Sequence, residues 1–191
     1  MRKNKGFTLI ELLAVIVILG VIMLIAVPNI VSTLDKNKKE SFIEDAKQMI
    51  GSAEYKLRVD KSIEYPNNDD IVILRLSSLD SSTLDESPYG TFYSKEYSFV
   101  AITKERVNSS EYERVFYAHL VSCDNRECKD DSDPDFAEYK YGINLKSNAI
   151  LNGDKERFNV IETGTDVDVK LIENENKIKE KLGKTGTVKV Y

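Results

Sequence analysis

The stretch "KGFTLIELLAVIVILGVIMLIAVPNI", residues 5–30, decides how this chain must fold. From Leu12 to Leu34 no ionisable side chain occurs, and a helix over these 23 residues would be about 35 Å long. Because the hydrocarbon core of a bilayer is roughly 30 Å thick, the sequence predicts a membrane-spanning helix. Glu11 is the only charged residue between Phe7 and Leu34. A charge inside a membrane helix costs about 2.5–3.5 kcal/mol and usually marks function.

The rest of the chain has a very different composition. Of the 191 residues, 41% are hydrophobic and 31% are charged, but residues 7–34 are almost purely apolar and residues 35–191 are polar and strongly charged. The polar part is long enough to bury a core of its own. Arg2, Lys3 and Lys5 precede the apolar run, so the positive-inside rule keeps the N-terminus in the cytoplasm and exports the remainder.

The exported part is acidic. Without residues 1–6 the chain has 24 basic and 32 acidic residues, a formal charge of −8. Phosphate binding needs local cationic charge, so we expect no nucleic acid as the main ligand.

Two ordinary explanations of such an N-terminus are a cleaved secretory signal and a plain membrane anchor. A secretory signal has an apolar region of about 7–15 residues and a small-x-small cleavage site. Here the apolar run is longer, and "AVPNIVSTLDK" (26–36) contains no clean A-x-A. A plain anchor is compatible with the pattern but leaves Glu11 unexplained, so on the residues alone a plain anchor and a functional Glu11 both remain open.

The residues "KGFTLIEL", 5–12, closely resemble the processing motif of type IV prepilins and related pseudopilins. The resemblance covers about the first 30 residues. It implies that a membrane peptidase cuts after Gly6 and that Phe7, the new N-terminus, is N-methylated. Gly20 and Pro28 also fall where such helices often carry a glycine and a proline.

The resemblance implies a structural filament subunit, a major or minor type IV pilin. Its expected partners are other pilin subunits, a prepilin peptidase, an inner-membrane assembly platform and, before assembly, the membrane. Glu11 of one chain would then pair with the Phe7 ammonium of a neighbour, because two charges that are each costly in an apolar setting become tolerable together. The expected location is the cytoplasmic membrane before assembly and a cell-surface filament after it.

Two alternatives have different functions. A pseudopilin of a type II secretion or DNA-uptake machine shares the same N-terminal half, and a membrane-anchored binding protein would leave Glu11 incidental. No P-loop, Rossmann glycine pattern, HExxH motif or catalytic triad is visible, so we expect neither an enzyme nor a cofactor.

Pro28 lies inside the predicted helix, where it removes a backbone hydrogen bond and costs about 3 kcal/mol. Either a kink or a segment that unwinds on assembly is expected there, although harmless prolines are common in membrane helices.

Beyond the apolar run the pattern becomes amphipathic. Apolar residues at steps of three and four form one helical face, widened by Phe42 and Met49: Ile43, Ala46, Ile50, Ala53 and Leu57. This predicts one helix continuing to about Val59, with Pro66 as a stop signal and with the stripe buried against the exported domain. The expected organisation is a leader over 1–6, a transmembrane and assembly helix over 7–34, an amphipathic continuation over 35–65 and a β-rich domain over 66–191.

After residue 70 the sequence favours strands. We expect strands at 71–76, 97–107, 112–121, 136–145 and 187–191. The residues "NSSE" (108–111) predict a hairpin turn, and 77–90 is a turn-rich segment. Leu171, Ile178 and Leu182 predict a short helix that ends at Gly183. The fold class is therefore α+β, with an antiparallel sheet packed on the long N-terminal helix in the general plan of pilins.

The two cysteines, Cys123 and Cys128, lie in "CDNREC". Export favours oxidation, so a disulfide closing this short loop is expected, with a modest effect on stability; two free thiols are the alternative. A zinc site is not expected, because His119 is the only histidine.

Acidic residues alternate in "DDSDPD" (130–135), where Asp131, Asp133 and Asp135 have the spacing of hard oxygen ligands for calcium. An EF-hand loop needs glycine at its sixth position, where Phe136 stands. The interpretation we favour is a solvated acidic loop. His119, in a predicted strand, is interpreted as a structural histidine.

Overall fold

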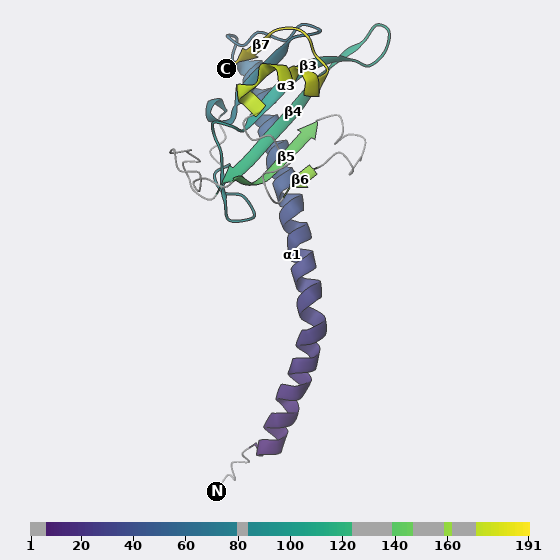
Figure 1. The fold of residues 1–191 in the computed structure, drawn as a ribbon, viewed down its shortest axis with the longest axis vertical. Helices are drawn as coiled ribbons and strands as arrows, with labels where there is room; N and C mark the ends of the chain where they lie inside the picture. Colours follow the sequence, from purple (N-terminus) through teal and green to yellow (C-terminus); the bar gives the residue numbers. More distant parts are fainter. Residues whose placement is uncertain (1–6, 80–83, 124–138, 147–158, 162–170) are drawn as a thin grey trace. The chain divides into compact units, whose positions relative to one another are not determined.

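The computed structural model describes residues 7–79, 84–123, 139–146, 159–161 and 171–191 (Figure 1). Residues 1–38 and 39–191 form two compact units. Helix α1, Leu9–Val59, contributes to both, and the second unit adds a mixed sheet and short helices. The predicted α+β class, a long N-terminal helix with a sheet, is confirmed.

Helix α1 ends at Val59, as the apolar pattern predicts. Asp60 N donates to the carbonyl of Lys56 at 2.9 Å, and the Asp60 carboxylate then accepts from the backbone N and the hydroxyl of Ser62. Such an Asx turn competes with helix continuation, so the helix stops before Pro66 and residues 60–65 lie outside it.

The sheet has the strand order β6-β5-β4-β3-β1-β7, and β2 also pairs with β4. Its strands are β1 Ile71–Arg75, β2 Phe92–Tyr93, β3 Phe99–Arg106, β4 Tyr112–Cys123, β5 Tyr139–Lys146, β6 Asn159–Ile161 and β7 Val188–Val190. The hairpin predicted around "NSSE" is confirmed: β3 and β4 pair antiparallel, from Phe99 opposite His119 to Arg106 opposite Tyr112.

One strand pair departs from the antiparallel pattern. β7 runs parallel to β1, with Ile71 opposite Val188. Parallel neighbours need a crossover, usually through a helix. Helix α3, Glu175–Leu182, precedes β7 along the chain and ends at Gly183, which adopts the left-handed conformation at φ 63°. The short sequence of β7 carries no signal for the direction of its partner.

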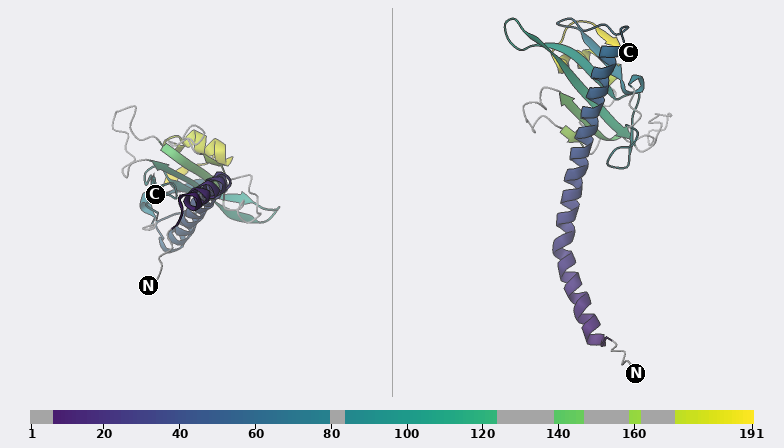
Figure 2. Two further views of the ribbon diagram at one scale, coloured as in Figure 1. Left: turned by 90° about the horizontal axis from the view of Figure 1, so that it is seen from below. Right: turned by 180° about the vertical axis from the view of Figure 1, so that it is seen from behind.

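The sheet buries residues on both faces, because successive side chains of a strand point to opposite sides. Val100 and Ile102 of β3 join the cluster that faces α1, whereas Phe99 and Ala101 join the cluster that includes Ile178 of α3. Residues 39–59 of α1 therefore cover one face and α3 the other (Figure 2, right).

The predicted stripe of α1 is the side that packs on the sheet. Its buried members are Phe42, Ala46, Met49, Ile50, Ala53 and Leu57, and Ile43 is half-buried at the edge. Tyr93 packs edge-on against Phe42, with ring centroids 5.3 Å apart, and its hydroxyl donates to Asp45 at 2.6 Å. Burial raises the pKa of Asp45, and burial together with the Asp45 carboxylate raises the pKa of Tyr93.

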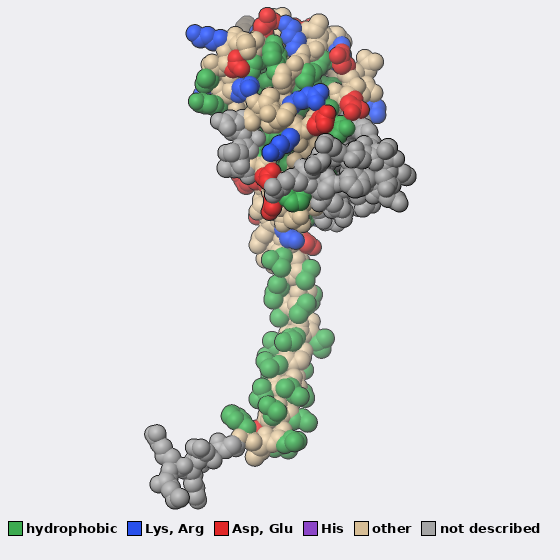
Figure 3. Space-filling model, turned by 90° about the vertical axis from the view of Figure 1, so that its left-hand side faces the viewer, with side chains coloured by type: hydrophobic (Ala, Val, Ile, Leu, Met, Phe, Trp, Pro, Cys, Tyr) green, Lys and Arg blue, Asp and Glu red, His purple; other side chains and the backbone are tan. Residues whose placement is uncertain are grey.

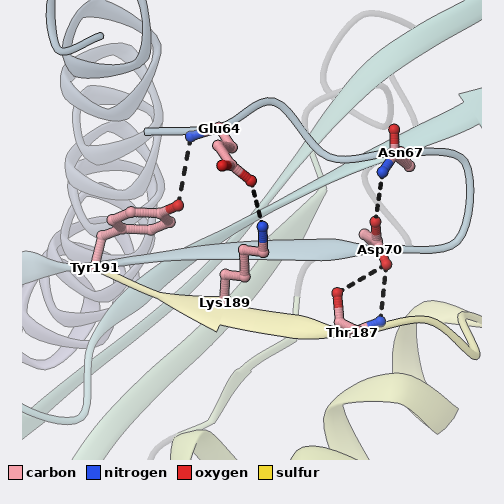
Figure 4. A network of polar contacts seen from close by, with 6 residues as sticks. All are labelled: Glu64, Asn67, Asp70, Thr187, Lys189 and Tyr191. Carbon is pink, nitrogen blue, oxygen red and sulfur yellow. Dashed lines mark hydrogen bonds and ion pairs between the residues drawn. The ribbon is translucent and has the colours of Figure 1, made fainter. Parts of the chain in front are cut away.

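Polar contacts hold the C-terminal segment against the loop that follows α1 (Figure 4). Lys189 forms an ion pair with Glu64, and Tyr191 accepts a long hydrogen bond from Glu64 N at 3.4 Å. Asp70 accepts from the backbone N and the hydroxyl of Thr187 at 2.8 and 2.9 Å. These hydrogen bonds, the backbone donor first, lower the pKa of Asp70.

Candidate assembly site

The first turn of α1 contains a capping box formed by Thr8 and Glu11. Glu11 Oε2 accepts from the Thr8 backbone N and from Thr8 Oγ1, both at 2.7 Å. In return, the Glu11 backbone N makes a longer contact of 3.4 Å to Thr8 Oγ1. This reciprocal arrangement satisfies donors that a helix start leaves without partners.

The capping box explains where the Glu11 carboxylate is held. Both contacts from Thr8 go to Oε2, and in the described part of the chain no hydrogen bond uses Oε1. Glu11 is exposed, so this oxygen is accessible to a cation from outside the chain. Sequence reasoning missed Thr8, although the T-x-x-E spacing is the ordinary signature of a capping box.

The apolar part of α1 lies in the first unit and buries almost nothing within it. From Leu9 to Leu34 the large apolar side chains are 48–83% exposed, and Figure 3 shows them along the helix. An 18-residue window here has a mean hydropathy of 3.1, and among the described helices only α1 is long and apolar enough to cross a membrane. Such a surface is stable only in contact with lipid or with other apolar helices.

The helix continues through Pro28 without a break. Three polar side chains that follow the proline bond back to the helix: Asn29 Nδ2 to the carbonyl of Ile25, and Ser32 Oγ and Thr33 Oγ1 to the carbonyl of Asn29. Pro28 removes the donor for the carbonyl of Leu24, and these three bonds go to other carbonyls. A role for Pro28 in assembly stays a prediction.

The cleavage residues lie at the edge of the described chain. Gly6 is outside the described residues, and Phe7 is 87% exposed. Gly20 lies on the open surface of α1, with no atom within 4 Å of the position that a β-carbon would occupy. Among the described residues of the first unit, none covers Phe7.

The other predicted site residues lie in the second unit. Cys123 is half of a disulfide, whereas Cys128 lies outside the described residues, so their pairing stays a prediction. Asp131, Asp133 and Asp135 also lie outside, and the described residues contain no group of three side chains suited to a metal ion.

His119 is fully buried in β4. Its Nδ1 lies 2.6 Å from Asn144 Oδ1, and its ring packs on Phe99 with centroids 5.0 Å apart. This environment is that of a packed core residue, and a structural role remains our interpretation.

Comparison with known proteins finds similarity that includes the N-terminal end of the chain. Residues 1–27 match the model of the prokaryotic N-terminal methylation motif. The chain is 38% identical over 58 residues to type II secretion system core protein G of Klebsiella pneumoniae, covering 30% of this chain and 41% of that protein. It is 37% identical over 70 residues to the protein of the same name from Vibrio cholerae serotype O1, covering 36% and 46%.

The chain therefore carries the prokaryotic N-terminal methylation motif and is similar over part of its length to core protein G of type II secretion systems. The matched stretches span less than half of the relatives' length. No solved structure matches the chain significantly.

Proposed function

We propose that this protein is a structural, non-enzymatic subunit of a type IV pilin-like filament. The observation that carries the proposal is the unburied apolar surface of α1 from Leu9 to Leu34. Near its start lies the Glu11 carboxylate, whose Oε1 accepts no hydrogen bond from the residues that the structure describes. Lipid covers this surface before assembly, and the same helix of other copies covers it afterwards. The methylation motif over residues 1–27 supports a membrane-inserted stage followed by an assembled stage.

Maturation creates the partner for Glu11. A prepilin peptidase cuts after Gly6, and the new ammonium at Phe7 is methylated while it keeps its positive charge. Mass spectrometry of membrane protein is expected to show a chain that begins at Phe7 with one added methyl group. Mature protein that retains Met1 contradicts this proposal and favours a plain anchor.

In the assembled filament, Glu11 Oε1 receives the N-terminal ammonium of a neighbouring copy while Oε2 stays bonded to Thr8. Both charges are costly in an apolar bundle unless they pair, so the pair selects one axial stagger. Glu11→Gln keeps an acceptor for Thr8 but removes the charge. We expect normal processing and a loss of assembled filaments, measured by cross-linking of subunits in whole cells. Asp35→Asn, at the first carboxylate after the apolar run, should assemble as wild type.

If Glu11→Gln protein is processed and assembles at the wild-type level, the docking role is wrong. The remaining filament would then be held by apolar packing alone. This outcome would leave the maturation step untouched.

Two kinds of filament fit the same helix. The relatives are named as core components of type II secretion systems, and this favours a pseudopilin that works with an inner-membrane assembly platform. A surface pilus, built by a major or minor pilin, is the second candidate and is supported by the shared N-terminal motif. Imaging cells with an antibody to residues 171–191 separates them, because only a pilus places this segment on long surface fibres.

A further inference from the structure

The hairpin of β3 and β4 extends past both of its neighbouring strands. Ile102 is the last residue of β3 that pairs with β1, and Tyr117 is the first residue of β4 that pairs with β5. Residues 103–116 therefore lie outside both pairings, and Figure 1 shows this hairpin reaching away from the rest of the sheet. Its tip is held by its own hydrogen bonds, because Asn108 Oδ1 accepts from the backbone N of Ser110 and of Glu111 at 3.1 and 2.9 Å.

The register of this hairpin places like charges opposite each other. Lys104 lies opposite Arg114, and Glu105 lies opposite Glu113. Successive side chains of a strand point to opposite faces, so the two cations share one face and the two glutamates share the other. Like charges directly opposite each other destabilise a strand pair, whereas opposite charges stabilise it. A local conflict of this kind is expected at functional surfaces.

The cationic face continues to the tip of the hairpin. Arg106, opposite Tyr112, lies on the same face as Lys104 and Arg114, and we call these three residues the cationic patch. Lys104 Nζ and the Arg106 guanidinium lie 5.0 and 6.0 Å from the ring centre of Tyr112, and the Arg114 guanidinium lies 5.2 Å from that of Tyr65. In the part of the chain that the structure describes, none of the three cations forms an ion pair. The rings therefore position the cations without neutralising them.

Neighbouring elements leave the positive charge of the patch in place. Lys184 Nζ donates to the carbonyl of Lys104 at 2.5 Å, so a fourth cation lies beside the patch. A groove between α1 and β4 is lined by Arg114 together with Glu54 and Arg58 of the helix. Glu54 is paired with Arg58 at 3.4 Å, so this pair adds no net charge next to Arg114.

The spacing of the patch matches a phosphate polymer. Alternate residues of a strand lie about 7 Å apart, which sets the separation of Lys104 and Arg106 along β3. An extended chain covers about 3.6 Å for every three bonds. Six bonds separate the phosphorus atoms of a glycerol-phosphate polymer, so its repeat is also about 7 Å. Lysine and arginine both bind phosphate oxygens, through charge-assisted hydrogen bonds.

A nucleic acid strand has the same repeat but carries a base on every unit. Tyr112 and Tyr65 already have cations over their rings, so neither offers the bare ring on which bases stack. Without residues 1–6 the chain has 32 acidic and 24 basic residues, which opposes the dense phosphates of a duplex. We propose that the cationic patch binds an extended polyol-phosphate polymer outside the cytoplasmic membrane.

The test measures binding of the full-length protein, in detergent, to a fluorescent oligomer of glycerol phosphate by anisotropy at several salt concentrations. Each phosphate neutralised on a flexible strand contributes about −0.7 to the slope of log K against log salt, so three contacts give about −2. Lys104→Gln with Arg114→Gln should bring the slope to about −0.7 and weaken binding about tenfold or more at low salt. Lys177→Gln with Lys179→Gln in α3 removes the same charge and should change neither quantity.

Wild-type protein that shows no salt-dependent binding overturns the inference, and so do equal slopes for the two double variants. Two further probes examine the chemistry of the ligand: polyglutamate of the same charge and oligothymidine. Both are expected to bind less tightly than the glycerol-phosphate oligomer. If either binds as tightly, the assignment to a polyol phosphate is wrong.

A stability measurement separates binding from folding. Lys104→Glu replaces the like-charge pair with an opposite-charge pair across the strands, so it should raise the midpoint of thermal unfolding while it abolishes binding of the oligomer. A lower midpoint would show that the cations support the fold, and would contradict a patch kept for a ligand. None of these measurements depends on filament assembly, so their failure leaves the proposed function standing.

Discussion

Phe42 is the aromatic anchor of residues 39–59 of α1, and its truncation gives a stability change that the structure allows us to estimate. The side chain is fully buried, and its ring centre lies 5.3 Å from that of Tyr93 and 6.0 Å from that of Tyr89. Burial of such a ring contributes about 1.5–3 kcal/mol, and each aromatic pair adds about 0.5–1.5 kcal/mol. Phe42→Ala is therefore expected to cost about 3–5 kcal/mol, in line with measured Phe→Ala substitutions in cores.

The assay is pulse proteolysis of the full chain in detergent across a urea gradient, which reports the free energy of unfolding. Total stability of a domain is about 5–15 kcal/mol, so the expected loss shifts the midpoint strongly. Tyr55→Ala is the matched control, because Tyr55 lies on the same helix and is 67% exposed; its cost should stay within about 0.5 kcal/mol. If Phe42→Ala costs less than about 1 kcal/mol, the helix does not depend on this contact with the sheet.

Further changes test other parts of the second unit. Burial raises the pKa of Asp45 above its ordinary 3.8, so the stability that this group contributes at low pH is lost as pH rises from the unfolded pKa through the folded pKa. The free energy of unfolding of Asp45→Asn, minus that of the wild type, should therefore increase between about pH 4 and pH 7, and an unchanged difference would refute this cause. Gly186→Ala should destabilise the domain in thermal unfolding, because a Cβ there lies 2.5 Å from the carbonyl oxygen of Asp69. Gly51→Ala is the control: its Cβ would have nothing within 4 Å, so this substitution should stabilise the domain by about 0.5–1 kcal/mol. The reverse order of stabilities would contradict the packing at Gly186. Alkylation without reductant should leave Cys123 and Cys128 unmodified, and two alkylated thiols would exclude their disulfide.

The long helix and its two environments were predictable because they depend on local periodicity. An apolar run without charges specifies a surface for lipid or other helices, and the stripe from Ile43 to Leu57 specifies a buried side. The end of the helix near Val59 also follows from local chemistry, since the Asp60 carboxylate accepts a hydrogen bond from Ser62 N and forms an Asx turn just after the last helical residue. The hairpin of β3 and β4 was recognisable from its alternating strands and polar turn.

Features that depend on distant partners were not predictable from one sequence. β2 and β6 are two and three residues long and form only because longer strands lie beside them. The parallel pairing of β7 depends on where α3 returns the chain to the sheet. The groove near Arg58 and Arg114 joins residues 56 positions apart, and no motif connects them.

At the candidate assembly site, the sequence identified the charge but missed how it is held. Glu11 attracted attention because it is costly in an apolar run. Its bonds to Thr8 follow from the T-x-x-E spacing, which was present in the quoted motif. The free energy of a capping interaction is typically about 1 kcal/mol, less than the insertion cost of a charge, so the cap alone does not account for Glu11.

The central claim is that Glu11 of one subunit contacts the N-terminal amine of another. Filaments are assembled from an equal mixture of subunits labelled with ¹⁴N or ¹⁵N and treated with a carbodiimide, which joins a carboxylate directly to an amine in contact with it. Mass spectrometry of the peptide linking Glu11 to Phe7 should show mixed-isotope species at about half of the total, as random pairing between chains requires. Linked peptides of uniform isotope only, or no link at Glu11 in intact filaments, would contradict the account.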